Sequence, residues 1–139
     1  MNRLVLDTDI LTLFQAGHPA VLRRAQTCSA GQLALTIISV EEELRGWYTR
    51  LRRAKKPDQL AIVYQRLTDA IRFFSRLEIL SFPVAAIARY NQLRSSYRSM
   101  SKNDLRIAAI VLEQGDTLVT RNVKDFQAIA GLMIEDWSK

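Results

Sequence analysis

The sequence predicts an α/β fold in three layers, with a central, mainly parallel sheet between two layers of helices. Short apolar runs that suit buried strands alternate with longer stretches whose apolar residues recur at helical spacing. Strands and helices that alternate in this way form parallel sheets through right-handed crossovers. The 139 residues, 48% of them hydrophobic, are expected to form one domain over residues 1–139.

The first strand is expected where the apolar run 4–6, which follows Arg3, ends in Asp-Thr-Asp. Helical spacing resumes from Ile10 to Gln15 and stops at Gly17, with Thr8 or Asp9 as the expected helix cap. The next elements are a helix from His18-Pro19 to about Thr27 and a β-branched strand at 32–38. Asp7 would then stand at the carboxyl end of the first strand.

Two long helices are expected next, and they should pack against each other as a hairpin. The first covers about 39–55, and its Ser39 and Glu42 have the spacing of a capping box. Pro57-Asp58 opens the second, over about 59–76. The apolar positions that recur at helical spacing in this second helix are Ile62, Leu67, Ile71 and Phe74.

The second half of the chain continues the alternation of strands and helices. Its expected elements are a strand at 77–81, a helix from Pro83 that ends before Ser101, a buried helix at 105–112 that stops at Gly115, a strand at 117–120, a short helix within 121–126 and a strand at 132–135. Ser101 and Asp104 repeat the spacing of a helix cap.

Composition excludes several classes of site. Cys28 is the one cysteine and His18 the one histidine, so an internal disulfide, a His-rich zinc site and a paired-imidazole ribonuclease are excluded. No apolar run approaches the roughly 20 residues of a membrane span, and a cytoplasmic protein is expected. With 20 Lys and Arg against 14 Asp and Glu, the net charge of +6 favours polyanionic partners such as nucleic acid.

Four acids stand where the chain returns to the carboxyl edge of the predicted sheet, the edge at which such sheets bind ligands: Asp7, Glu42, Asp104 and Asp125. Each alone is explained as a helix cap or as a partner of the helix dipole. Together they would repel one another unless a divalent cation neutralised them. Oxygen ligands without Cys or His suit Mg²⁺, with Mn²⁺ as a substitute.

With these residues in view, the sequence resembles the PIN-domain family and, within it, the VapC-like toxin ribonucleases of toxin–antitoxin pairs. The matching stretches are 6–11, 39–46, 103–109, 118–126 and 131–137. The resemblance implies a three-layer α/β/α PIN-like domain. It also implies a Mg²⁺-dependent endoribonuclease that hydrolyses RNA, a VapB-like antitoxin as partner, and a homodimer.

Carried over by position, Asp7 and Asp104 match the metal-binding aspartates of the family. Glu42 matches its glutamate because it stands four residues before Gly46, although the neighbouring Glu41 and Glu43 leave the register open. The resemblance implies metal binding by these three acids, with one ion held tightly and a second arriving with RNA.

At other positions around the implied site, this sequence departs from the usual pattern of the family. The fourth acid is either absent, with Asn122 in its usual place, or supplied by Asp125. Asp9 replaces the asparagine usual in the family, and it either joins the site or caps the helix. Thr8 and Thr120 could donate hydrogen bonds to the metal ligands.

Basic and aromatic residues follow Glu42. Arg45, Arg50 and Arg53, together with Arg52, Lys55 and Lys56, either lead RNA phosphates to the site or form a solvated helix face. Aromatic residues either form a groove for an antitoxin or belong to the core, and they are Trp47, Tyr48, Tyr64, Phe73 and Phe74. Two other functions stay open, a housekeeping RNA-processing nuclease without an antitoxin and a non-catalytic nucleic-acid-binding module.

Overall fold

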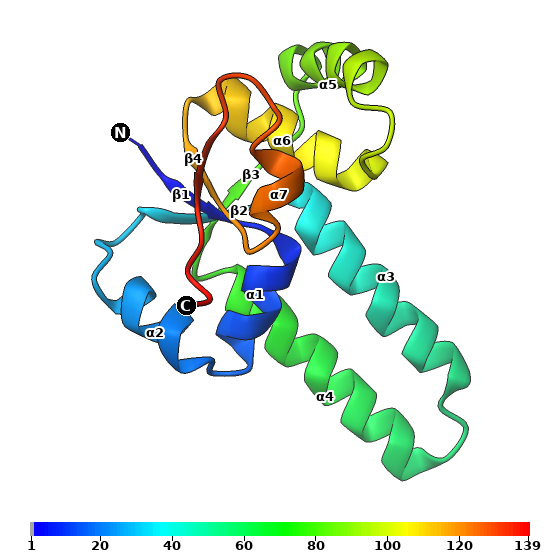
Figure 1. Ribbon diagram of the computed structural model, residues 1–139. Helices are drawn as coiled ribbons and strands as arrows, with labels where there is room; N and C mark the ends of the chain where they lie inside the picture. The colour runs from blue at the N-terminus through cyan, green and yellow to red at the C-terminus, as the bar shows by residue number, and fades with distance from the viewer. Residues whose placement is uncertain (1) are drawn as a thin grey trace.

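The computed structural model describes residues 2–139, and its centre is a five-stranded sheet (Figure 1). The strands are β1 (Leu4–Leu6), β2 (Leu33–Thr36), β3 (Glu78–Leu80), β4 (Thr117–Val119) and β5 (Met133–Glu135). Their order is β3-β2-β1-β4-β5, and every neighbouring pair is parallel. After β1 the chain forms β2 on one side of β1, and it later forms β4 on the other side of β1. Such a reversal next to the central strand is where α/β sheets bind ligands.

Helices cover both faces of the sheet, which confirms the predicted three layers (Figure 1). They are α1 (Thr8–Gln15), α2 (Pro19–Gln26), α3 (Ile37–Arg53), α4 (Pro57–Phe74), α5 (Val84–Ser96), α6 (Lys102–Gln114) and α7 (Val123–Phe126). The predicted hairpin of α3 and α4 is confirmed, and it extends well beyond the sheet (Figure 1). Within residues 2–139, no helix has the length and apolar character needed to span a bilayer.

The sheet separates two hydrophobic cores. Alternate residues of a strand point to opposite faces, so Val5 joins one core and Leu6 the other. The Val5 core is filled mainly by α6, which is buried along most of its length and ends at Gly115 in a left-handed turn with φ 68°. The Leu6 core is filled by α1, α2 and α4. Packing on both faces fixes the edge at which the strands end.

Two local predictions were wrong. The helix α3 begins at Ile37, and Thr36 caps it by accepting the Ser39 N–H at 3.3 Å, so Ser39 and Glu42 form no capping box. Ile62 and Ile71 do not face a core, since their exposed fractions are 56% and 52%. Ile62 lies on the part of α4 that extends beyond the sheet beside α3, whereas Ile71 lies in the last turn of α4, next to the buried Ala70 and Phe74 (Figure 1).

Candidate active site

Asp7 stands at the carboxyl end of the central strand and is 7% exposed. Its backbone is extended, and its carboxylate accepts the Ile10 N–H at 2.9 Å, so Asp7 itself caps α1 in place of the expected Thr8 or Asp9. Burial raises the pKa of Asp7 to about 6, and the charges of Asp9 and Asp104 add to the rise. The Thr120 hydroxyl and the Ile10 N–H lower this pKa in part.

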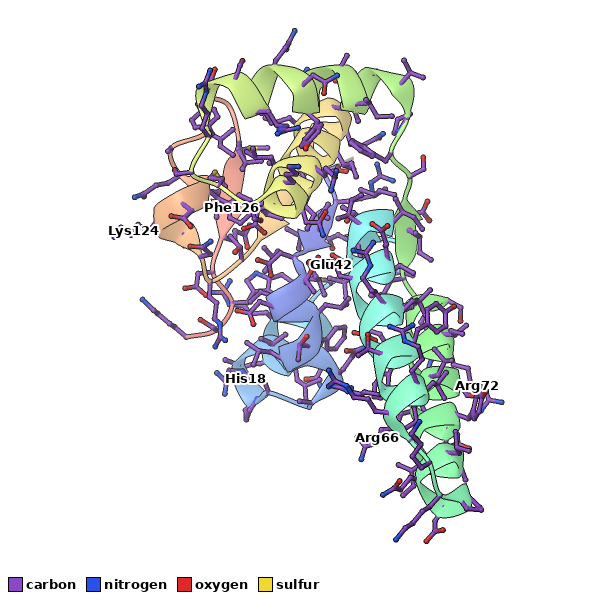
Figure 2. The ribbon with its side chains drawn as sticks, turned by 90° about the vertical axis from the view of Figure 1, so that its right-hand side faces the viewer. His18, Glu42, Arg66, Arg72, Lys124 and Phe126 are labelled. Carbon is purple, nitrogen blue, oxygen red and sulfur yellow. The ribbon has the colours of Figure 1, made fainter. Side chains whose placement is uncertain are left out.

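Glu42 lies in the second turn of α3, on the side that faces α1 (Figure 2). The Thr8 hydroxyl donates to its carboxylate at 2.7 Å and lies 2.9 Å from the Ser39 hydroxyl. Ser39 is fully buried, so these two hydroxyls are fixed between the helices. The resulting chain of hydrogen bonds holds Glu42 beside the residue that directly follows Asp7.

Asp104 occupies the first turn of α6, where the Ser101 hydroxyl accepts its backbone N–H at 3.1 Å and caps the helix as predicted. The pKa of Asp104 is raised, first by burial and then by the charges of Glu42 and Asp125. Asp104 in turn raises the pKa of Asp7. Asp104 therefore lies within electrostatic reach of each of the other three predicted acids.

The loop after β4 supplies the last of these acids. Thr120 is fully buried, and its hydroxyl accepts the Asn122 N–H at 3.0 Å. The Asn122 side-chain amide donates to the Asp125 carboxylate at 3.1 Å. Asn122 therefore holds Asp125 by a hydrogen bond, and only Asp125 of the two contributes a charge.

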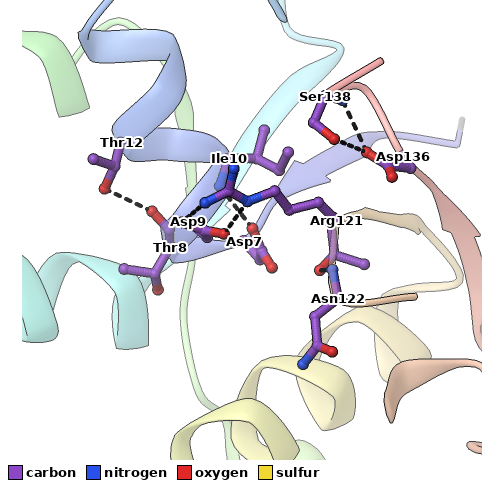
Figure 3. Close-up of polar contacts among 10 residues, drawn as sticks. Asp7, Thr8, Asp9, Ile10, Thr12, Arg121, Asn122, Asp136 and Ser138 are labelled. Atoms are coloured by element: carbon purple, nitrogen blue, oxygen red, sulfur yellow. Dashed lines mark hydrogen bonds and ion pairs between the residues drawn. The ribbon is translucent and has the colours of Figure 1, made fainter. Parts of the chain in front are cut away.

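Asp9 is paired with Arg121, a residue that the sequence prediction missed (Figure 3). The Arg121 Nε and Nη2 donate to the two Asp9 carboxylate oxygens at 2.6 and 3.2 Å. Positions 9 and 121 are too far apart in the chain for a local pattern to indicate the pair.

The donors at this edge suit a hard divalent cation. Within residues 2–139, no Lys, Arg or His nitrogen comes within 4.0 Å of the Asp7, Glu42, Asp104 or Asp125 carboxylates, although five other acids form such pairs. Over the same described range, no group of three or more Asp, Glu, His or Cys side chains is placed so that together they could hold a metal ion. Mg²⁺ commonly binds one or two carboxylates and keeps several waters. An open, hydrated cation therefore fits this arrangement better than a closed cage.

The comparison with protein families matches residues 4–132 to the PIN domain. The chain belongs to the PIN-domain family. Among curated relatives, a tRNA(fMet)-specific endonuclease VapC of Shigella flexneri is 25% identical and covers 99% of this chain and 100% of its own length. Ribonuclease VapC1 of Haemophilus influenzae strain R2866 is 27% identical over 97% of this chain and 98% of its own.

Solved structures agree with this PIN assignment. VapBC2 of Rickettsia felis, bound to a DNA fragment from its promoter, matches at 27% identity with a TM-score of 0.73, over 96% of this chain and 98% of the other. DNA-bound VapBC of Salmonella typhimurium has a TM-score of 0.74 over 99% of both chains at 24% identity, which supports the fold.

Two hollows meet at Glu42 in this PIN domain. One, of about 740 Å³, lies between α3 and the start of α6 and is lined by Arg45, Lys102 and Arg106. The other, of about 800 Å³, lies among α1, α3 and α4. Its cationic lining residues are Arg50, Arg66, Arg72 and Arg76, and the last three were missed because the α4 pattern was interpreted for its apolar residues only (Figure 2).

The three predicted RNA-binding arginines differ in their surroundings. Arg45 pairs with Glu41 at 3.0 Å, Arg50 lies 4.4 Å over the Trp47 ring, and Arg53 is exposed near the end of α3.

The five aromatic residues that were candidates for the groove differ in their burial and in whether they line the second hollow. Trp47 and Phe73 line the second hollow, Tyr48 and Tyr64 are exposed outside it, and Phe74 is 3% exposed in the core. Of the two alternatives that the sequence left open, a groove or the core, Phe74 belongs to the core.

Proposed function

We propose that this PIN-domain chain is a metal-dependent endoribonuclease and the toxin of a VapBC-type toxin–antitoxin pair. The observation that carries the proposal is the buried Asp7 at the carboxyl end of the central strand, which forms no ion pair within residues 2–139 and has a raised pKa to which the charge of Asp104 contributes. Relatives that match the chain along nearly its whole length carry the names ribonuclease VapC1 and endonuclease VapC. The proposed reaction is hydrolysis of an RNA phosphodiester bond.

In this proposal Asp7 and Asp104 hold Mg²⁺, and Glu42 binds it directly or through water. A divalent ion held there would supply a lower pKa for an attacking water and would offset the charge that develops on the phosphate oxygens. Glu42, fixed by the Thr8 hydroxyl, is placed to orient that water. Thr120 helps to orient the Asp7 carboxylate, and Asn122 does the same for Asp125.

The two basic hollows are the proposed approach for RNA, because both open onto Glu42. Arg45 lines the first, and Arg50, Arg66 and Arg72 line the second. Cations on both sides of the acids would hold the strand that the acids themselves repel. If these residues bind phosphates, the logarithm of the binding constant should fall against the logarithm of salt with a slope of about −0.7 per contact.

A VapB-like antitoxin is the proposed partner, supported by the similarity to solved VapBC complexes. The hollow among α1, α3 and α4 combines Trp47 and Phe73 with arginines, so an amphipathic segment with acidic residues would fit it. A homodimer and a single domain over residues 1–139 complete the proposal.

The decisive experiment incubates the purified chain with total RNA, with and without a chelator, and maps the ends that form. We expect cleavage that the chelator stops and that Asp7→Asn abolishes. Asp58→Asn is the matched control, since Asp58 is an exposed acid at the start of α4. Cleavage by Asp7→Asn at the parent rate would show that the assignment of the metal site is wrong.

A second experiment separates the toxin from the two other functions. Expression of the chain alone should arrest growth, and co-expression of the small protein encoded beside it should restore growth. A housekeeping nuclease would cut RNA without this rescue. A non-catalytic binding module would retain RNA intact and show no change in folding stability with Mg²⁺.

A further inference from the structure

The ion pair between Asp9 and Arg121 lies at the rim of the acidic site (Figure 3). Asp9 belongs to the first turn of α1, and Arg121 lies in the loop that connects β4 to α7. About half of each side chain is exposed, 52% for Asp9 and 49% for Arg121. The pair therefore brings together two segments that both border Asp7.

Folding alone does not explain the pair. Exposed ion pairs contribute little to stability, because water already solvates both charges and two side chains must be ordered. The same two segments are joined without the pair, since β1 pairs with β4 and the Asp7 N–H donates to the Val119 carbonyl oxygen at 3.0 Å. The pair is therefore expected to contribute little to the stability of the fold.

The geometry of the pair leaves part of the guanidinium free. Asp9 engages Nε and Nη2, and no described residue accepts a hydrogen bond from Nη1. Arg121 directly follows Thr120, whose hydroxyl acts on Asp7, and the Arg121 charge interacts with the Asp7 carboxylate as well. The planar donor fork of arginine matches the oxygens of a phosphate.

A phosphate needs such a cation at this edge. Four carboxylates at one sheet edge repel the backbone of an approaching nucleic acid, and the described part of the chain places no cation in contact with any of the four. A guanidinium held at the rim attracts that backbone while the four carboxylates stay free for metal.

We propose that Arg121 is a binding residue for a backbone phosphate of the RNA at the mouth of the site, and that Asp9 is the positioning residue that aims its guanidinium. This inference rests on the proposed ribonuclease function and adds a recognition residue to it.

The first test measures Arg121→Gln against Arg89→Gln. Arg89 forms a comparably exposed ion pair with Glu113 at 2.9 Å, between α5 and the end of α6 far from Asp104, so it controls for the loss of a surface charge. Binding of a single-stranded RNA oligonucleotide is followed by fluorescence anisotropy in chelator, which keeps the RNA intact, over a range of salt. We expect Arg121→Gln to bind about tenfold more weakly and to reduce the salt slope by about 0.7, as for one lost phosphate contact. Arg89→Gln should match the parent.

The second test separates Asp9 from a structural role. Asp9→Asn should raise KM for RNA with little change in kcat, because the Arg121 charge remains but its direction is lost. In the exchange Asp9→Arg with Arg121→Asp, the ion pair is retained while the cation moves to α1. We expect the unfolding temperature of the exchange variant to match the parent and its kcat/KM to stay low. Recovery of parental kcat/KM by this exchange would overturn the assignment.

The outcomes separate this inference from the proposed function. Parental RNA affinity and salt slope for Arg121→Gln would overturn the role of Arg121 whether or not the chain cuts RNA. A parent chain that binds RNA through Arg121 but never cuts it would contradict the ribonuclease function alone.

Discussion

A buried carboxylate lies at each end of the parallel strands, but only the one at the amino end forms an ion pair within residues 2–139. At the amino end, the Asp116 side chain is fully buried just before β4, and the chain itself neutralises it. The Arg3 backbone N–H donates to one Asp116 oxygen at 2.9 Å, and the Arg3 Nε donates to the other at 3.1 Å. At the carboxyl end, Asp7 is also buried but receives only uncharged donors.

The buried carboxylates at the two ends of the sheet therefore have different consequences for stability. A buried charge that has a partner within the chain is needed for the stability of the fold, because removing either partner leaves the other buried and unpaired. A buried charge without one is costly until something from outside neutralises it. The raised pKa values of Asp7 and Asp104 show that ionising these two candidate ligands costs free energy in the folded protein.

The largest expected difference between the two ends is in catalysis. Asp7→Asn should lower RNA cleavage by about a thousandfold, a loss of roughly 4 kcal/mol in transition-state stabilisation, because a ligand for the metal is lost. Asp116→Asn should leave kcat/KM unchanged when both are assayed well below the unfolding temperature. A comparable loss of activity in both variants would remove the distinction between the two ends.

The reverse difference is expected in folding. Asp116→Ala should lower the free energy of unfolding by about 3 kcal/mol, because it leaves the Arg3 guanidinium and backbone N–H without their buried partner. Urea titration measures this change, and Arg3→Ala is the complementary control. A change below about 1 kcal/mol would mean that the internal pair does not stabilise this end.

The pH dependence of stability tests Asp7 directly. Its pKa of about 6 in the folded chain exceeds the ordinary 3.8, so the folded state binds the proton more tightly and stability falls as pH rises between these values. Without divalent ions, Asp7→Asn should exceed the parent in free energy of unfolding by up to about 3 kcal/mol at pH 8. The two should converge near pH 3.5. A constant difference at every pH would exclude Asp7 as its source.

The smallest expected effect is stabilisation by metal. At a Mg²⁺ concentration ten times Kd, binding to the folded state alone adds about 1.4 kcal/mol, a shift of a few degrees in the unfolding temperature. Calorimetry should find this shift in the parent and in Asp116→Asn, and its absence in Asp7→Asn. An equal shift in all three would place the ion away from Asp7.

Local sequence patterns predicted much of this architecture, because strand ends and helix starts depend on neighbouring residues. The end of the first apolar run and the Ser101 cap were enough to assign Asp7 and Asp104 to the same edge of the sheet. Such patterns were wrong at Ser39, because Thr36 and Ser39 both have the spacing of a helix cap and the earlier one already satisfies the Ser39 N–H.

Long-range contacts were beyond the reach of such patterns. The Asp9–Arg121 pair spans 112 positions, and nothing adjacent to either residue indicates the other. Helical periodicity placed Ile62 and Ile71 on a buried face, but it carries no information on whether a neighbouring element is there to cover that face.

The position of β1 has a consequence for the order in which the molecule assembles. This strand is synthesised first, yet one of its two neighbours in the sheet is β4, with Leu4 paired to Thr117. Asp104 and Asp125 also come from the last third of the chain. A chain still being translated therefore carries Asp7 but cannot build the edge around it until most of its length has emerged.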